Sequence, residues 1–340
     1  MSAAPETQKP TNITGEGKSS EQETTPLSKQ YDTPLGLAHT TMQELKDRIK
    51  LHYDLASDYY LNLWGEHIHH GYWPPSSPDL PKEEAQINLI RLLLETSQIP
   101  TSPAPTSPPL KILDVGCGIG GTSRFLAREL AAHVTGITIS SKQVQSAKKL
   151  SDGSSKQYPD GEYIPLGPGK VRFIELDAET LGSYFTGPDD KFDIVWISEA
   201  LSHFPKKDLF FKNAFDVLKP GGKLVLADWF KDEGLTQEQF DADIKPIEDG
   251  MLLPPMCTVN GYVQFAKEVG LEVVGGPKDI SQEVKKTWDI SWSLIQKPSL
   301  WAFAFSQGRD GIAFLQAFRA MRRGYANGSF QYAVMGFAKP

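Results

Sequence analysis

The sequence predicts an α/β fold built on a mostly parallel sheet. Short β-branched runs alternate with helical segments between residues 111 and 227, and a glycine-rich turn follows the first of these runs. A further strand-like run closes the chain at residues 330–337. Alternation of strands and helices is typical of a parallel sheet that helices cover on both faces.

The N-terminal part is organised differently. Residues 1–35 are rich in Ser, Thr, Pro, Glu and Lys, and such a composition predicts a disordered tail. Residues 36–100 are expected to form an N-terminal helical cap, with one helix from Met42 and a second over residues 81–97. Five prolines between residues 100 and 109 exclude a helix there and link the cap to the domain over residues 110–340.

Within that domain, each strand and helix is predicted from its run of apolar residues. Helices are expected from Thr122, from Ser141 and over residues 207–218, residues 151–170 are expected to be a surface insertion, and the stretch after Trp229 should be mainly helical. Residues 230–325 are interpreted as a substrate cover. The predicted strands are residues 111–115, 133–138, 171–176, 192–197, 223–227 and 330–337.

Composition narrows the class of partner. The chain has 340 residues and a formal net charge of −7, which disfavours nucleic acid because phosphate binding needs clustered Lys and Arg. Two cysteines are too few for a disulfide framework or a Cys-based zinc site. The sequence shows no secretory signal and no run of about 18 apolar residues, so we expect a cytoplasmic protein without a membrane span.

The turn at residues 114–121 reads Asp-Val-Gly-Cys-Gly-Ile-Gly-Gly. Glycines allow positive φ and close approach of the backbone to a ligand, and the following helix start favours polar ligand atoms. The same letters fit the G-x-G-x-x-G pattern, so the turn alone does not distinguish a dinucleotide from S-adenosylmethionine.

Two observations favour S-adenosylmethionine. Asp114 lies at the C-terminal end of the first strand, where its carboxylate suits the ammonium of a methionine group and would repel a pyrophosphate. A dinucleotide site also expects an acid about 20 residues further on, but the second strand ends in Thr138. A dinucleotide oxidoreductase stays an alternative.

Three sequence blocks resemble a known family: residues 113–126 (LDVGCGIGGTSRFL), 136–140 (GITIS) with Gln143, and 64–73 (WGEHIHHGYW). They resemble the gamma-tocopherol methyltransferase family and related plant alkaloid N-methyltransferases, and more distantly sterol methyltransferases and cyclopropane fatty acid synthases. The resemblance runs from about Leu51 to the last residue. It implies a Rossmann-like class I methyltransferase fold whose last strand is antiparallel, with N-terminal helices and a helical substrate cover. It also implies S-adenosyl-L-methionine as cofactor, with S-adenosyl-L-homocysteine as product.

The resemblance also implies roles for single residues. Thr138 and Gln143 would bind the ribose, although Ser140 and Gln143 also fit a capping box. Asp177 would accept the adenine amine, or it is a turn-forming Asp. The cofactor-binding residues expected are Tyr53, His69, Asp114, Gly116, Cys117, Gly118, Gly120, Thr138, Ile139, Gln143, Asp177, Ala178 and Ser198.

Aromatic and histidine residues crowd residues 64–73. Aromatic faces attract a sulfonium cation, so Tyr53, His69 and Tyr72 are interpreted as part of a lid, while Trp64 is expected to pack in the core. His67, His69 and His70 raise the alternative of a zinc site. No carboxylate or cysteine is paired with them in sequence, and sulfonium methyl transfer needs no metal, so the sequence predicts none.

A candidate base follows the fourth strand in the run Ser198-Glu199-Ala200-Leu201-Ser202-His203. His203 is the best base by chemistry, because an imidazole is mostly neutral near pH 7. The resembling family usually has Glu-His here, and Ser202 replaces the Glu, so Glu199 and His203 both remain catalytic candidates. A histidine that only satisfies a backbone carbonyl is the alternative.

The function expected is methyl transfer from S-adenosylmethionine to an O, N or C atom of a hydrophobic or aromatic small molecule, in natural-product metabolism. A catalytically idle fold that acts as a regulatory or assembly partner is the alternative. The oligomeric state is left open.

Overall fold

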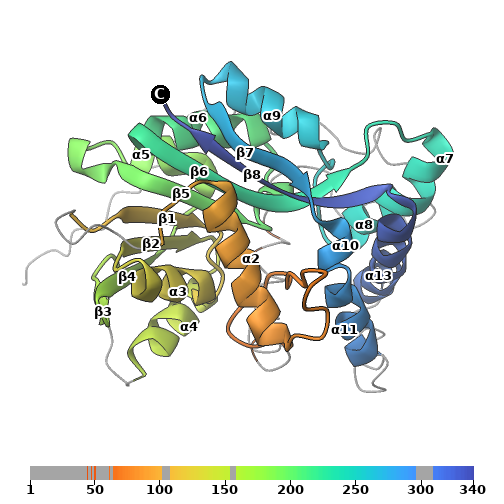
Figure 1. The fold of residues 1–340 in the computed structure, drawn as a ribbon, viewed down its shortest axis with the longest axis horizontal. Helices are drawn as coiled ribbons and strands as arrows, with labels where there is room; N and C mark the ends of the chain where they lie inside the picture. Colours follow the sequence, from red (N-terminus) through yellow and green to blue (C-terminus); the bar gives the residue numbers. More distant parts are fainter. Residues whose placement is uncertain are drawn as a thin grey trace, which may run out of the picture.

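The computed structural model describes residues 64–101, 108–153, 158–295 and 309–340, together with Glu44, Asp47, Lys50 and Leu61. The expected tail over residues 1–35 and the lid residue Tyr53 lie outside the described residues. Of the helix expected from Met42, only Glu44, Asp47 and Lys50 are described, and all three are helical. An eight-stranded sheet runs through the described part in the order β3-β4-β2-β1-β5-β6-β8-β7 (Figure 1).

The centre of the sheet is parallel, as predicted. The strands β4, β2, β1, β5 and β6 run parallel to one another, and β8 runs antiparallel to β6. All six strands predicted from the sequence are confirmed, with β6 longer than expected. Their bounds are β1 (Lys111–Val115), β2 (His133–Thr138), β4 (Gly169–Glu175), β5 (Phe192–Ser198), β6 (Leu218–Lys231) and β8 (Phe330–Ala338).

Two edge strands correct the sequence prediction. The strand β3 (Ile164–Leu166) pairs antiparallel with β4, so the surface insertion expected over residues 151–170 is wrong at its second half. The strand β7 (Glu272–Asp279) pairs antiparallel with β8 inside the stretch expected to be mainly helical. Side chains along β7 are mostly exposed, so its sequence lacks the apolar pattern that marks a buried strand.

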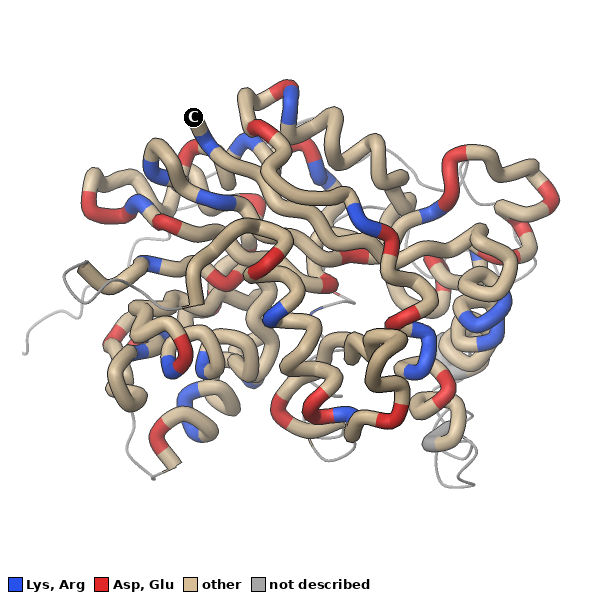
Figure 2. The backbone as a smooth tube through the Cα atoms, viewed as in Figure 1, with Lys and Arg blue, Asp and Glu red and all other residues tan. Residues whose placement is uncertain are grey.

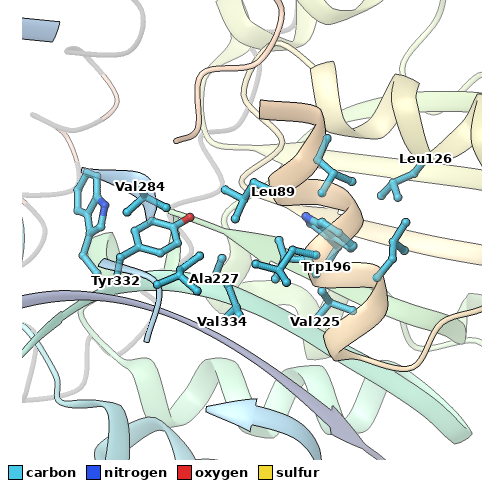
Figure 3. Packing of buried hydrophobic residues seen from close by; sticks show 14 of the residues in the cluster. Leu89, Leu126, Trp196, Val225, Ala227, Val284, Tyr332 and Val334 are labelled. Atoms are coloured by element: carbon cyan, nitrogen blue, oxygen red, sulfur yellow. The ribbon is translucent and has the colours of Figure 1, made fainter. Parts of the chain in front are cut away.

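Helices cover both faces of the sheet (Figure 1). One face carries α2 (Lys82–Thr96), α3 (Gly121–Glu129) and α4 (Ser141–Asp152), whose apolar residues share one core cluster. The other face carries α5 (Leu181–Tyr184), α6 (Lys207–Val217) and α9 (Val259–Glu268), which share a second cluster. Figure 3 shows the first cluster, in which Leu89, Leu126 and Trp196 pack between α2, α3 and β5.

Local signals explain where the site-forming helices begin. The Ser140 hydroxyl accepts a hydrogen bond from the backbone N–H of Gln143 at 3.1 Å, which caps α4. The helix α3 begins directly after Gly120, which has a φ of 79°. A side chain at this position would also collide with the ring of Phe173. Both the positive φ and this close contact therefore require glycine at the helix start.

A group of helices lies at one end of the sheet, on the right of Figure 1. It consists of α8 (Lys245–Gly250), α10 (Ser281–Val284), α11 (Lys286–Ile295) and α13 (Arg309–Asn327), and α13 packs along α8. We call these four helices the cover helices. Residues 230–325 are therefore not one continuous cover, because β7 and α9 within that range belong to the sheet and its helical layer.

Short helical turns complete the described elements. Arg323 and Asn327 near the end of α13 bind Asp243, and these contacts hold the π-helical turn that contains Asp243 against α13. These turns are η3 (Ala178–Thr180), η4 (Pro188–Asp190), η5 (Leu201–His203), α7 (Gln237–Gln239) and η6 (Phe240–Ile244).

Charged residues of both signs are interspersed over the backbone (Figure 2). Within the described ranges, none of the helices combines the length and apolar character that crossing a bilayer requires.

Candidate active site

A cavity of about 830 Å³ lies along the carboxyl ends of β1, β2, β4 and β5. This edge is where open α/β sheets bind their ligands. The loops after these strands form one half of the wall, which we call the cofactor half. The cover helices α8, α11 and α13 and the outer end of β6 form the other, which we call the acceptor half. The loop over residues 64–70 contributes to both.

The glycine loop builds the floor of the cofactor half. Gly116 and Gly118 have φ values of 73° and 55°, a conformation that favours glycine. The backbone N–H groups of Gly116 and Cys117 both donate to the carbonyl of Ile137, which ties the loop to β2. Gly120, expected to bind the cofactor, faces Phe173 and the core instead of the cavity.

Asp114 is the penultimate residue of β1, lies on the cavity wall and is 3% exposed. The Ser123 hydroxyl donates to its Oδ2 at 2.5 Å. Burial raises the pKa of Asp114 to about 6, and the hydrogen bond from Ser123 opposes this rise in part. A buried carboxylate of this kind favours a cationic ligand group.

Thr138, Ile139 and Gln143 also lie on the wall of the cofactor half. Ser140 caps the backbone of Gln143, whereas the Gln143 side chain accepts from the Thr138 hydroxyl at 2.6 Å. Capping therefore uses the backbone of Gln143 and leaves its side chain on the wall. The two roles considered for this residue are compatible.

Asp177 and Ala178 form the far wall of the cofactor half, at the start of η3. Asp177 Oδ1 accepts from the backbone N–H of Glu179 at 2.9 Å, which is the turn-forming role that the sequence left open. Because the residue also lines the cavity, this turn presents Asp177 to a ligand.

The loop over residues 64–70 is docked on α2 and α3. The Gln86 side chain donates to the carbonyls of His67 and His69, and a Cβ at Gly121 would lie 2.0 Å from the Glu66 carbonyl oxygen. His69 lies on the cavity wall with its Nδ1 at 2.8 Å from the His70 carbonyl, and burial lowers its pKa.

The three histidines do not converge on one point. Burial, followed by the charges of His69, Arg124 and Lys82, lowers the pKa of His67 to about 3. His70 instead turns toward Glu199. Among the described residues, no group of three His, Cys, Asp or Glu side chains is arranged to hold a metal ion.

Glu199, one of the two catalytic candidates, is held tightly on the cavity wall. Its φ of 55° is unusual for a residue other than glycine, and such strained residues concentrate at functional sites. Oε1 accepts from the His70 backbone N–H at 2.7 Å and from the Tyr332 hydroxyl at 2.8 Å, while Oε2 lies 2.8 Å from His70 Nδ1.

The electrostatics of Glu199 follow from these contacts. Burial raises its pKa, but the positive charge that the His70 ring carries when protonated, the hydrogen bonds from His70 and a further contribution from His69 lower the pKa below its usual value. Burial alone would favour the neutral acid. The partners therefore keep Glu199 ionised.

His203, the other candidate, lies on the cavity wall in η5, with its ring 6.4 Å from the Trp229 ring. Lys207 Nζ donates to the Ser202 and Phe204 carbonyls at 3.3 and 3.0 Å, and these hydrogen bonds hold the turn in place. Burial lowers the pKa of Lys207 to about 8. Ser202 itself is buried and does not reach the cavity.

Apolar and aromatic side chains form the acceptor half. Trp229 of β6, Trp288 of α11 and the ring of His70 pack against one another with centroid distances of 5.0 to 6.1 Å. The remaining apolar wall consists of Met251, Leu252, Phe314 and Phe318. Tyr72, expected in the lid, packs against the core instead.

Sequence reasoning missed the contribution of His70, Trp229 and Tyr332 to the site. Glu199 and Tyr332 are 133 positions apart and meet only because β5, β6 and β8 are neighbours in the sheet. The register places Tyr332 directly opposite Trp229. A strained residue after β5 was the one local signal, and it is visible only in the backbone.

Comparison with known proteins decides the family. The family described as Methyltransferase domain matches residues 113–226, and Mycolic acid cyclopropane synthetase matches residues 40–160. A 2-methyl-6-phytyl-1,4-hydroquinone methyltransferase from Synechocystis sp. is 33% identical over 252 residues, which are 72% of this chain and 70% of that protein. The chain belongs to the tocopherol methyltransferase family.

Other relatives of the methyltransferase agree with this. A probable chloroplastic tocopherol O-methyltransferase from Oryza sativa subsp. japonica is 30% identical over 307 residues, 87% of this chain and 79% of that protein. Among solved structures, the mycolic acid cyclopropane synthase CmaA1 complexed with SAH shares the fold, with a TM-score of 0.68 at 20% identity. The match covers 86% of this chain and 98% of that one.

The methyltransferase is an enzyme that uses S-adenosylmethionine and acts on small molecules. The cofactor half fits this ligand, because it combines left-handed glycines with the buried Asp114 carboxylate. The alternatives of a dinucleotide oxidoreductase and of an idle fold are therefore set aside.

Proposed function

We propose that this methyltransferase transfers a methyl group to an oxygen, nitrogen or carbon atom of a hydrophobic or aromatic small molecule, in natural-product metabolism. The observation that carries the proposal is the acceptor half of the cavity, where Trp229, Trp288 and Phe318 form an apolar wall that continues into the cofactor half. Ligand sites for small molecules are mostly apolar with a few placed polar groups.

The substrates named for relatives of this chain support a hydrophobic acceptor. They include a 27-O-demethylrifamycin SV methyltransferase from Amycolatopsis mediterranei and a 24-methylenesterol C-methyltransferase from Arabidopsis thaliana. A solved structure of a geranyl diphosphate C-methyltransferase from Streptomyces coelicolor A3(2) has a TM-score of 0.62 at 16% identity, covering 87% of this chain and 98% of that one.

Residues of the cofactor half would hold the methyl donor. Asp114 would pair with the ammonium of its methionine group, Thr138 and Gln143 with its ribose, and Asp177 with its adenine amine. The donor supplies an activated methyl group. The protein then has to exclude water, align the acceptor atom with that methyl group and remove a proton.

The two catalytic candidates differ in what they offer. The carboxylate of Glu199 has a lowered pKa and accepts three hydrogen bonds, so it is a weak base and serves better as a positioning group. His203 lies on the wall beside Trp229, where it would contact the polar end of an acceptor.

The test is transfer of a labelled methyl group from S-adenosylmethionine to a panel of acceptors. The panel contains a prenylated hydroquinone, a sterol and a hydrophobic amine, with glycine and glycerol as water-soluble controls. We expect label in at least one hydrophobic acceptor and none in the controls. Transfer to the water-soluble compounds alone would contradict the proposal.

Cofactor binding is measured separately. S-adenosylhomocysteine should raise the melting temperature, because a ligand selective for the native state stabilises it by mass action, and NAD should not.

A further inference from the structure

The side chain of His70 is held by a buried carboxylate in the manner of a general base. Glu199 Oε2 lies 2.8 Å from His70 Nδ1, and Glu199 Oε1 accepts from the His70 backbone N–H at 2.7 Å. An ionised carboxylate only accepts hydrogen bonds, so Nδ1 carries the hydrogen in this pair. In the neutral ring, the lone pair then lies on Nε2.

The surroundings of His70 leave Nε2 without a partner among the described residues, although this nitrogen is buried. The ring lies on the cavity wall, 4.9 Å from the ring of Tyr332 and 5.0 Å from that of Trp288, measured between centroids. Burying a polar atom without a hydrogen bond is unfavourable. A ligand group that donates to Nε2 would remove this cost.

Two further contacts orient the pair. The Tyr332 hydroxyl donates to Glu199 Oε1 at 2.8 Å, and its pKa is raised by burial and by the Glu199 charge, so it keeps its proton. Glu199 is itself fixed by its left-handed backbone, with its N–H donating to the Ala227 carbonyl at 2.8 Å. An orienting acid, a ring and an unused nitrogen form the arrangement that activates a base.

Resting on the proposed function, we propose that His70 is the catalytic base for the acceptor, with Glu199 and Tyr332 as positioning residues. The electron pair of the acceptor atom forms the bond to the methyl carbon, and the carbon–sulfur bond breaks with its pair left on sulfur. The proton of the acceptor passes to Nε2. The products are the methylated acceptor, S-adenosylhomocysteine and an imidazolium ion paired with Glu199.

The proposal assigns the acceptor class more closely. A base is needed only where the reacting atom carries a proton that must leave, as in a hydroxyl group or a phenol carbon. The acceptor half accordingly should take a hydrophobic molecule with a hydroxyl or phenol at the reacting end, oriented toward His70. A tertiary amine would need no base.

The first arm of the test compares His70→Phe with His133→Phe. Phenylalanine keeps an aromatic ring at position 70 but has no nitrogen, and His133 is a matched histidine at the start of β2, outside the cavity. We expect His70→Phe to lower kcat for a phenolic acceptor by roughly 100-fold or more, because positioned proton transfer contributes about that much. Its affinity for S-adenosylhomocysteine should stay within about threefold of the wild type, and His133→Phe should behave like the wild type. A kcat for His70→Phe within about threefold of the wild type would overturn the proposal.

The second arm uses Glu199→Gln, which keeps an acceptor oxygen for Nδ1–H but removes the charge. Among the described residues, the titratable groups that face the His70 ring are Glu199, Tyr332 and His69, and of these three Glu199 carries the negative charge. Losing it disfavours the imidazolium, and the acidic limb of the pH–rate profile should move to lower pH. A purely structural ion pair would lower activity or stability without moving that limb, and this result would overturn the proposal even if His70→Phe failed to fold.

The third arm does not depend on turnover. The visible absorbance of 4-nitrophenol reports its ionisation in the presence of saturating S-adenosylhomocysteine. The wild type should ionise the bound phenol at lower pH than free solution does, and His70→Phe should not. Equal ionisation in both proteins would overturn the role of His70. Absence of methyl transfer to any hydrophobic acceptor, with the ionisation difference intact, would contradict the proposed function and leave His70 as the base.

Discussion

Replacing Asp114 by Asn should stabilise the protein while weakening its hold on the cofactor. The wild-type carboxyl group has its pKa raised from 3.8 to about 6 by burial. A shift of about two units, at about 1.36 kcal/mol each, corresponds to about 3 kcal/mol. Asn has nearly the same shape, keeps an oxygen for the Ser123 hydroxyl and carries no charge to bury.

The direction of the pH dependence of stability follows from proton binding. Between pH 3.8 and about 6 the folded protein holds a proton that the unfolded chain releases, so rising pH lowers the free energy of unfolding in this window. The full penalty is present above the folded-state pKa. We therefore expect the free energy of unfolding of Asp114→Asn to exceed that of the wild type by about 3 kcal/mol at pH 8, and by only about half as much at pH 5.

Urea unfolding without ligand at the two pH values measures this difference. Asp208→Asn, at an exposed position of α6, is the matched control. Calorimetric titration with S-adenosylhomocysteine gives the second readout, where loss of a charge-assisted contact worth about 1.5–3 kcal/mol should weaken binding by roughly 10-fold to 100-fold. A variant that is less stable at pH 8 and binds with unchanged affinity would refute both steps.

Three other changes test separate parts of the structure. Gly121→Ala places a Cβ 2.0 Å from the Glu66 carbonyl oxygen, so it should displace the loop over residues 64–70 and weaken S-adenosylhomocysteine binding. Gly234→Ala, where a Cβ meets no close contact, is the control. Equal affinities of the two variants would contradict this prediction. Tyr262→Phe removes the hydroxyl that donates to the buried Asp228 at 3.1 Å and should cost about 1–3 kcal/mol in urea unfolding, whereas an unchanged midpoint would show that the contact is dispensable. Trp288→Phe should raise the KM of a hydrophobic acceptor roughly fivefold, because losing about 50 Å² of apolar contact costs about 1 kcal/mol. A change in cofactor affinity alone would place Trp288 outside the acceptor half.

Sequence predicted the centre of the sheet because its strands are buried on both faces. The strand β1 is the run Lys-Ile-Leu-Asp-Val, in which all residues after Lys111 are buried. Apart from Asp114, its buried residues are apolar, and such a run stands out from its helical neighbours. The strand β3 is three residues long with Pro165 at its middle, and β7 is mostly exposed. Neither carries the apolar pattern on which the prediction depends.

The same distinction between local and long-range signals separates the site residues that the sequence predicts from those that it misses. Most cofactor-half residues are near a glycine turn or a strand end, so a local motif predicts them and the structure places them on the cavity wall. Gly120 is the exception, because its neighbours come from β4 and α4 and no local pattern reveals which way it faces. His70 was missed as a partner of Glu199 because their contact spans 129 positions.

The length of β6 has a consequence for how the acceptor can change over evolution. Its pairing with β5 ends at Ala227, but four more residues, including Trp229, pair with β8 alone. The same two strands thus continue from the cofactor half beneath the acceptor half, whereas the opposite wall is made of separate short helices. Substitution, insertion or loss in those helices leaves the strands and the donor's position unchanged. A lineage with this architecture is free to acquire new acceptors by remodelling the cover helices alone.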